Sequence, residues 1–355
     1  MTFSYYQINQ LRQHAKMGVE MKFGVFDHMD DGGVPLEQQF EERLKLVEAY
    51  DCLGFYAYHL AEHHGTPLGL APSPGIFLAA VAQRTKRLRF GALQYSLPLY
   101  HPIRLIEEIC MLDQLSGGRL ELGVGRGVSP IEVGFYGVDP KAGPRQFPEA
   151  LQLIKKGLTV DALTFHGEFY HFDEVPMVLR PLQKPYPPIW YGVTSPDATH
   201  WAALENAHMV TLLPTEGARA VIDRYKSEWA DFGKPEKDLP LRGVMRLVVL
   251  ADKDAQALRT AERAYASWLH HMRLLWDQRG IDFPLRLPPD IGSMMQVGAA
   301  FVGTAAGFRE FIGDSVDAIG ANYMTCDVAF GDMTFDEAMQ TTELIGREVI
   351  PAFAG

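Results

Sequence analysis

Apolar strand-like segments and helical segments alternate eight times along the 355-residue chain, and this alternation limits the possible folds more than any other feature. The first unit joins the strand-like "MKFGVF", residues 21–26, to a pattern in which Leu36, Phe40, Leu44 and Val47 recur at helical spacing. Further strands are expected at residues 55–60, 88–94, 119–125, 188–193, 208–213, 241–251 and 321–329. Eight such units predict an α/β fold, a (β/α)8 TIM barrel with insertions, rather than an open doubly wound sheet with a dinucleotide fingerprint.

Two segments interrupt the alternation within what we expect to be one barrel domain, residues 21–355. Residues 163–187 alternate apolar and polar side chains and then become rich in proline, which predicts an inserted hairpin. Residues 280–304, which include Met294, are expected to be irregular and to form either a mobile lid or a static insertion. Residues 1–20 precede the first strand and are interpreted as a leader or extension, with a short helix packed on the barrel as the alternative.

Charge and cysteine content exclude several classes of function. A formal net charge of −11 without a run of Lys and Arg argues against nucleic acid and anionic membranes and favours a small-molecule partner. No apolar run approaches the roughly 20 residues that span a bilayer, and the polar opening lacks a secretory signal, so we expect a cytoplasmic protein. Cys52, Cys110 and Cys326 show no CxxC spacing and are interpreted as small buried hydrophobes in a reducing compartment.

The segment "YHLAEHHG" follows the second predicted strand, so Glu62, His63 and His64 are expected at the barrel rim where catalytic groups gather. An imidazole there titrates near neutral pH and can exchange a proton with a reacting oxygen, which makes His63 the strongest candidate. A metal site that uses His59 and His63 at i, i+4 is an alternative, but it lacks a third ligand and its residues look extended. We therefore expect no metal, and His59 and His64 are also explained as polar groups that satisfy the loop.

Two other strand ends carry residues expected of a phosphate site. The segment "GVGRG", residues 123–127, leaves the backbone open to a ligand beside Arg126, whose guanidinium can bind phosphate in a bidentate manner. Arg145, near the start of the next helix, is a second positive candidate. Thr194 and Ser195 follow the fifth strand and begin a helix, whose free N–H groups favour an anion. A structural turn, a surface arginine and ordinary helix capping are the alternative explanations.

Several of these motifs occur together in the order typical of one family. They are "AEHH", "GALQYSLPLYHPIR", "LDQLSGGRLELGVGRG" and the closing "GTAAGFREFI" with "GREVIPAF". Over residues 21–353 the chain resembles the bacterial luciferase-like flavin monooxygenases. The resemblance implies a barrel that binds reduced FMN, supplied by a separate NAD(P)H-dependent flavin reductase. It also implies that O2 is activated as a flavin C4a-hydroperoxide, which oxidises a small organic substrate such as a long-chain aldehyde.

The resemblance further implies roles for individual residues. His63 takes the position of the family's catalytic histidine, beside Glu62 and His64. A non-proline cis peptide beneath the flavin ring is implied between Leu93 and Gln94. The residues implied to hold the flavin phosphate are Arg126, Arg145, Thr194 and Ser195.

Two departures from the family pattern qualify the resemblance. Gly125 stands where the light-emitting subunit carries a reactive cysteine, so thiol chemistry at that position and luminescence are not implied. Gln94 and Tyr95 replace small residues under the ring, which leaves the orientation and type of flavin open.

Two other functions stay open for the same fold. A deazaflavin F420-dependent oxidoreductase would transfer hydride without oxygen, although the two histidines of "AEHH" favour FMN. A non-catalytic flavin-binding partner subunit would keep the phosphate contacts but has no need of His63, which is present here. The resemblance also implies a homodimer, and it does not identify the substrate or the reductase.

Overall fold

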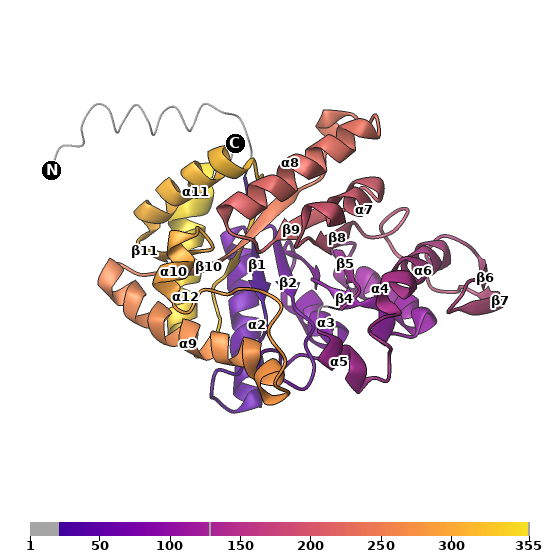
Figure 1. Cartoon of the computed structure of the whole chain (residues 1–355), viewed down its shortest axis with the longest axis horizontal. Coiled ribbons are helices and arrows are strands. Elements are labelled where there is room, and N and C mark those ends of the chain that lie inside the picture. The colour runs from indigo at the N-terminus through magenta and orange to yellow at the C-terminus, as the bar shows by residue number, and fades with distance from the viewer. Residues whose placement is uncertain (1–20, 128, 354–355) are drawn as a thin grey trace.

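A ring of parallel strands forms the centre of the molecule. The computed structural model describes residues 21–127 and 129–353, so the expectations for residues 1–20 lie outside the described part. Each of the strands predicted from the alternation lies in the ring (Figure 1). They are β1 (Lys22–Asp27), β2 (Ala57–Leu60), β3 (Arg89–Ala92), β5 (Leu122–Gly125), β8 (Ile189–Gly192), β9 (His208–Thr211), β10 (Arg242–Leu250) and β12 (Tyr323–Asp327).

The sheet follows the order β3-β2-β1-β12-β10-β9-β8-β5-β4, where β4 is the two-residue strand Tyr95–Ser96. A parallel bridge between Phe90 and Leu120 brings the two ends of this path together, and the Glu121 N–H donates to the Phe90 carbonyl at 2.8 Å. The predicted (β/α)8 barrel is therefore confirmed as a near-closed parallel barrel, and the carboxyl ends of its strands meet at one rim.

Helices surround the ring and bury their apolar faces against it. Glycine ends several of them as expected: Gly54 has φ +85° and its N–H donates to the Tyr50 carbonyl. The α-helices are α2 (Leu36–Leu53), α3 (Pro74–Arg84), α4 (Pro102–Ser116), α5 (Pro130–Phe135), α6 (Gly143–Gly157), α7 (Thr199–Leu204), α8 (Thr215–Asp231), α9 (Asp254–Gln278), α10 (Ile291–Gln296), α11 (Ala305–Ile319), α12 (Phe335–Leu344) and α13 (Ile350–Phe353). The 3-10 turns are η1 (Leu97–Leu99), η2 (Pro196–Ala198) and η3 (Glu236–Asp238), and η4 (Ile345–Val349) is a π-helix.

The segment 280–304 is more regular than its sequence indicates, so the expectation of an irregular segment is wrong for its second half. Asp290 caps α10 by accepting the Ser293 N–H at 2.8 Å. The following strand β11 (Ala300–Gly303) pairs in parallel with β10. Only the first part, up to about residue 290, lacks helix and strand.

An antiparallel hairpin made of β6 (Ala162–His166) and β7 (His171–Pro176) lies between α6 and β8. It projects beside α6 at the right of Figure 1. The carboxylate of Glu149 on α6 accepts backbone N–H groups from Glu168, Phe169 and Tyr170 at 2.8, 2.8 and 2.9 Å. These hydrogen bonds fix the hairpin turn against α6.

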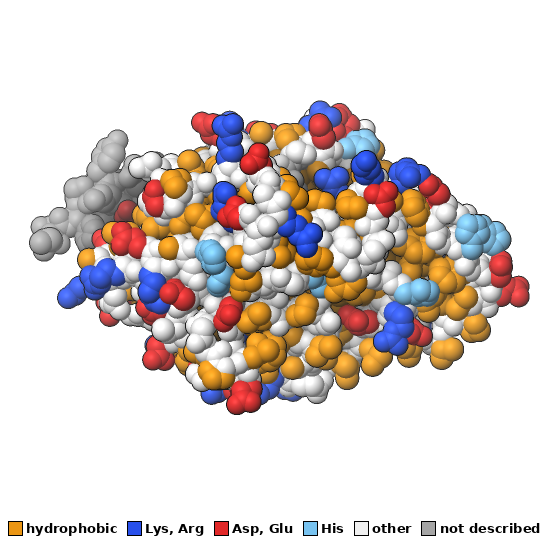
Figure 2. All heavy atoms as spheres, turned by 60° about the horizontal axis from the view of Figure 1, so that its bottom comes forward, with side chains coloured by type: hydrophobic (Ala, Val, Ile, Leu, Met, Phe, Trp, Pro, Cys, Tyr) orange, Lys and Arg blue, Asp and Glu red, His pale blue; other side chains and the backbone are white. Residues whose placement is uncertain are grey.

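The surface carries both signs of charge, and in Figure 2 Lys and Arg are interspersed with Asp and Glu on the face shown. Cys110 and Cys326 are buried, as expected, but Cys52 is exposed near the end of α2, so its interpretation as a buried hydrophobe is wrong. Within residues 21–127 and 129–353, none of the helices has the length and apolarity needed to cross a bilayer.

The seam between β3 and β5 leaves no room for a side chain at Gly91. A Cβ there would lie 1.9 Å from the Glu121 carbonyl oxygen, which is backbone and cannot move freely. We expect Gly91→Ala to lower the free energy of unfolding by about 1–3 kcal/mol, measured by urea denaturation. Gly143→Ala is the matched control because no atom lies within 4 Å of its Cβ position. Equal effects of the two substitutions would contradict the close packing of the seam.

Candidate active site

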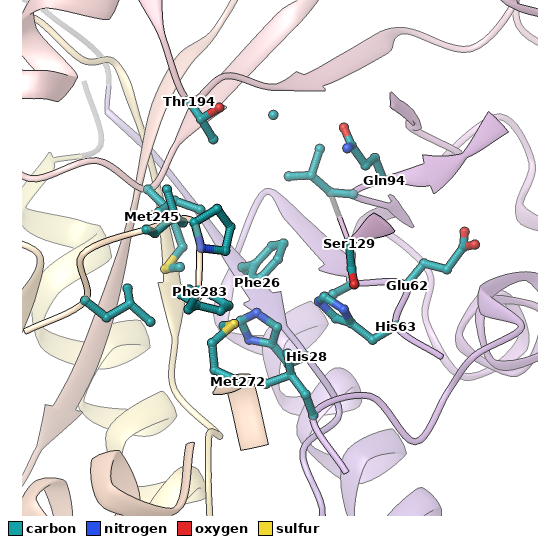
Figure 3. A pocket seen from close by; sticks show the side chains of 18 of the residues that line it. Phe26, His28, Glu62, His63, Gln94, Ser129, Thr194, Met245, Met272 and Phe283 are labelled. Carbon is teal, nitrogen blue, oxygen red and sulfur yellow. The ribbon is translucent and has the colours of Figure 1, made fainter. Parts of the chain in front are cut away.

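A cavity of about 320 Å³ opens at the carboxyl ends of the barrel strands. Its walls come from the loops after β1, β2, β5, β8 and β9, from α9, and from residues 283–288. Most of the lining is apolar, and Phe26, Met245, Met272 and Phe283 surround its centre (Figure 3). A concave, mostly apolar cavity with a few polar groups is typical of a small-molecule site.

His63 lies on the cavity wall and is oriented by Glu132 of α5. Its Nδ1 lies 3.3 Å from Glu132 Oε1, while Glu132 Oε2 accepts the His64 N–H at 2.8 Å. Burial alone would raise the pKa of Glu132, but the charge and hydrogen bond of His63 lower it below its ordinary value. The contact with Glu132 engages Nδ1 and orients the ring, which leaves Nε2 as the nitrogen available to a ligand. Among the described residues, Nε2 has no hydrogen-bond partner.

Sequence reasoning missed Glu132, although a local signal exists. Ser129 precedes Pro130 and accepts the Glu132 N–H at 3.3 Å, which caps α5 and points Glu132 back toward the rim. The Ser-Pro-Ile-Glu sequence after the glycine-rich strand end therefore predicts a short helix with a rim carboxylate.

Glu62 and His64 support the loop and present no free polar atom to the cavity. Glu62 Oε2 accepts the Ser96 N–H at 3.1 Å and the Tyr100 hydroxyl at 2.9 Å, and Oε1 lies 2.9 Å from His64 Nε2. His64 Nδ1 lies 2.8 Å from the Tyr136 hydroxyl. Figure 3 shows the Glu62 carboxylate pointing away from His63 and the cavity centre. The geometry is that of positioning residues, which hold the loop that carries His63.

A second histidine, His28, also lines the cavity and was not predicted. It directly follows β1, is buried, and its Nδ1 lies 3.2 Å from Asp327 Oδ2 at the end of β12. Its ring stacks on the His63 ring with centroids 5.7 Å apart (Figure 3). Its position immediately after the first strand was the available signal, because strand ends meet at the rim.

His59 lies inside the barrel rather than in the cavity. Its Nε2 is 2.8 Å from the Tyr323 hydroxyl, and it packs on Trp190 with centroids 4.7 Å apart. Burial lowers the pKa of His59 to about 3, so the ring stays neutral. His59 and His63 thus serve different sites, and no group of three metal-binding side chains occurs within the described ranges 21–127 and 129–353.

Leu93 and Gln94 also line the cavity, and the peptide bond that connects them is cis, as the resemblance implies. Gln94 Oε1 is buried and has no hydrogen-bond partner among the described residues. A Cβ on Gly125 would lie 1.9 Å from Gln94 Cδ, so glycine at this position makes room for the Gln94 amide.

The predicted phosphate residues separate into two groups. The first group comprises Thr194, which lines the cavity, Ser195, the next residue in the chain, and Arg126, which is exposed near the partly buried Tyr191. The predicted helix after β8 is a 3-10 turn followed by the short α7. Arg145 instead forms an ion pair with Glu168 of the hairpin and does not line the cavity.

The family model for luciferase-like monooxygenases matches residues 21–312. The chain belongs to the luciferase-like monooxygenase family. An uncharacterised protein of Sinorhizobium fredii, y4wF, is 40% identical over 331 residues, which cover 93% of this chain and 97% of that protein. The oxygenase component of the flavin-dependent trigonelline monooxygenase of Acinetobacter baylyi is 26% identical over 356 residues and covers 94% of this chain and 96% of that protein. The protein is thus an oxidoreductase of this family.

Solved structures agree with the fold. Monooxygenase RslO1 from Streptomyces bottropensis has a TM-score of 0.82 at 26% identity and covers 94% of this chain and 100% of its own. The oxygenating constituent of 3,6-diketocamphane monooxygenase from Pseudomonas putida, solved with FMN, has a TM-score of 0.77 at 22% identity, with 94% and 98% coverage. The F420-dependent tetrahydromethanopterin reductase from Methanopyrus kandleri has a TM-score of 0.71 at 16% identity, with 94% and 99% coverage. The last two likenesses concern the fold alone, so they leave the cofactor undecided.

The neutral histidines inside the barrel predict that stability falls with acidification. Burial lowers the pKa of His208 to about 4 in the folded protein. Between about pH 6.5 and pH 4 this side chain is therefore protonated in the unfolded chain but not in the folded one. Stability is therefore lost as the pH falls from about 6.5 toward 4. His208→Asn keeps an acceptor for the Leu241 N–H and removes this titration. We expect its unfolding free energy to fall by about 1–2 kcal/mol less than that of the wild type between pH 7 and 5, measured by urea denaturation. If wild type and His208→Asn lost the same unfolding free energy between pH 7 and 5, the lowered pKa of His208 would be contradicted.

Proposed function

We propose that the protein is the oxygenase component of a two-component, FMN-dependent monooxygenase. It receives reduced FMN from a separate NAD(P)H-dependent reductase and uses O2 to oxidise a small organic substrate, such as an aldehyde. The observation that carries the proposal is His63, fixed by Glu132 at the wall of a concave, mostly apolar cavity. Reduced FMN, when bound, would supply the electrons that activate O2.

Lining residues around Gln94 fit a flavin. The unpartnered Gln94 Oε1 offers a hydrogen-bond acceptor, and Gly192 leaves the wall opposite it bare, with a Cβ position 3.6 Å from that oxygen. Arg126, Thr194 and Ser195 would hold the phosphate, because a guanidinium and hydroxyl groups together suit an anion. Arg145 would join them only by leaving Glu168.

The protein's own part in the chemistry is to exclude water and to hold a proton. Residues 283–288 and α9 cover the cavity with Phe283, Leu285 and Met272, which keeps water from a reactive oxygen species. Of the expected lid, residues 280–304, we propose that the part before α10, up to about residue 290, acts as the lid, because β11 is paired in the sheet. His63 Nε2 is placed to accept a proton from a reacting oxygen or to return one to it.

Different observations support the flavin, the reductase and self-association. The trigonelline enzyme is named flavin-dependent and an oxygenase component, which supports a separate reductase. F420 is the second candidate because an F420-dependent reductase shares the fold. We also propose a homodimer, supported by the exposed apolar side chains Ile76 on α3 and Met111 and Leu115 on α4.

The phosphate role of Arg126 is tested by binding. Because a hydrogen bond to a charged group contributes about 1.5–3 kcal/mol, we expect Arg126→Ala to weaken reduced FMN binding by about 10–100-fold in anaerobic titrations. Arg219→Ala on α8 is the matched control, because Arg219 is exposed and does not line the cavity. This variant should bind reduced FMN as the wild type does. Reduced F420 that binds more tightly than FMN would contradict the cofactor assignment.

His63→Gln tests the proton-transfer role. We expect substrate oxidation to fall by about 10²–10⁴-fold while more of the O2 consumed is released as H2O2, with FMN affinity unchanged. His166→Gln in the exposed hairpin is the control. The yields of oxidised product and H2O2 would be measured together with screened aldehydes. Unchanged yields in His63→Gln would overturn the assigned role.

A further inference from the structure

The short helix α5 lies between the loop that carries His63 and the segment that covers the cavity. It has only six residues, Pro130–Phe135, and a helix of this length has little stability of its own. Its buried side chain Ile131 belongs to a small separate cluster rather than to the large hydrophobic core of the barrel. The position of α5 therefore depends on the contacts that it makes on its two sides.

On one side, α5 holds the loop after β2 through both oxygens of one carboxylate. Glu132 Oε1 lies 3.3 Å from His63 Nδ1, and Glu132 Oε2 accepts the His64 N–H at 2.8 Å. Phe135 packs against the next residue of the loop, because a Cβ on Gly65 would lie 2.9 Å from Phe135 Cε2. The orientation of the His63 ring thus depends on where α5 lies.

On the other side, α5 packs against the end of α9 and the segment that follows it. Ile131 clusters with Leu275 and Trp276 of α9, and Phe283 packs against this cluster. The Trp276 and Phe283 rings meet edge to face, with centroids 5.6 Å apart and an interplanar angle of 82°. Figure 1 shows the end of α9 beside α5. One apolar side chain of α5 therefore joins the lid to the helix that orients His63.

The start of the lid is attached to the same helix. Arg279, at the end of α9, places its guanidinium carbon 5.2 Å from the centroid of the Phe135 ring, a cation–π contact. Gly280 follows with φ +62°, a conformation that glycine adopts without strain. The lid thus begins at a turn that is anchored on α5, and Phe283 makes a second contact three residues later.

We propose that Ile131 and Phe283 are positioning residues that act on His63 through Glu132, so that docking of the lid sets the orientation of the His63 ring. With the lid in place, Phe283 packs against the Ile131 cluster and α5 presents Glu132 to the loop. When the lid leaves, α5 loses part of its apolar contact, and the carboxylate no longer holds Nδ1 in one position. This inference rests on the proposed function, because it uses the lid and the role of His63 given there.

The coupling joins two requirements of the proposed chemistry. A reactive oxygen species has to be kept from water, and the group that exchanges a proton with it has to be oriented. If one contact serves both, His63 is correctly placed only while the lid excludes water from the cavity. Proton exchange in the open state, which would release H2O2 instead of product, is then disfavoured.

Hydrogen exchange of the His64 amide tests the coupling without cofactor or turnover. This N–H donates to Glu132 Oε2, so it exchanges when α5 moves away from the loop. The Ala61 N–H, three residues earlier, donates to the Asp27 carbonyl of β1 at 2.8 Å and is the internal reference. We expect Phe283→Ala in the full-length protein to raise the exchange rate at His64 about 5–30-fold and to leave Ala61 unchanged. An unchanged rate at His64 would overturn the proposal.

Three further variants separate this path from general damage to the lid. Leu285→Ala truncates another lid side chain that lines the cavity but is not part of the Ile131 cluster, so His64 should exchange as in the wild type. Phe283→Leu keeps an apolar contact with Ile131 and should restore most of the protection. Ile131→Ala should act as Phe283→Ala does, and the double variant should exchange no faster than the faster single variant. An equal rise in Leu285→Ala, or additive effects in the double variant, would contradict a path through α5.

The outcomes distinguish this inference from the proposed function. The His64 amide is measured without FMN or O2, so a failure of the FMN assignment leaves the exchange rates interpretable. A rate that responds to Phe283 in a protein that oxidises no substrate would keep the coupling and reject the proposed chemistry. If Ile131→Ala does not fold, Phe283→Ala and Phe283→Leu still decide the question, because Phe283 is only partly buried.

Discussion

Parallel pairing around a ring places the carboxyl ends of the barrel strands at one rim, and the candidate site depends on this constraint. His28 and Asp327 are 299 positions apart in the chain, yet His28 follows β1, Asp327 ends the neighbouring strand β12, and the two lie within hydrogen-bond distance. His63 and Glu132 meet in the same way from the ends of β2 and β5. Closure of the ring at Phe90 and Leu120 therefore also fixes the geometry of the cavity.

A carboxylate partner distinguishes the rim histidines His28 and His63 from His59 and His208. His59 and His208 lie among apolar and aromatic side chains without a carboxylate partner, and burial lowers the pKa of both. At the rim, Glu132 and Asp327 each hold one imidazole by Nδ1 and leave Nε2 for a ligand. Glu62 and His64 are held by Ser96, Tyr100 and Tyr136, so they stiffen the loop that carries His63.

The sequence predicted what depends on local patterns and missed what depends on contacts between distant segments. Strand periodicity located the ring, and "AEHH" located His63. The four-residue β11 and six-residue α10 are too short for a periodic signal. The ion pair of Arg145 depends on how the hairpin packs against α6. Glu132 had a local capping signal in Ser129, but its pairing with His63, like that of Asp327 with His28, depends on strand ends that the ring brings together.

Rapid mixing tests the central claim, monooxygenase chemistry with reduced FMN, most directly. The protein would be mixed anaerobically with reduced FMN and then with oxygenated buffer while absorption spectra are recorded. The account predicts an oxygenated flavin spectrum that persists before oxidised FMN appears, because the apolar cavity excludes water. Oxidation at the rate of free reduced FMN would contradict it and would make F420 the leading cofactor.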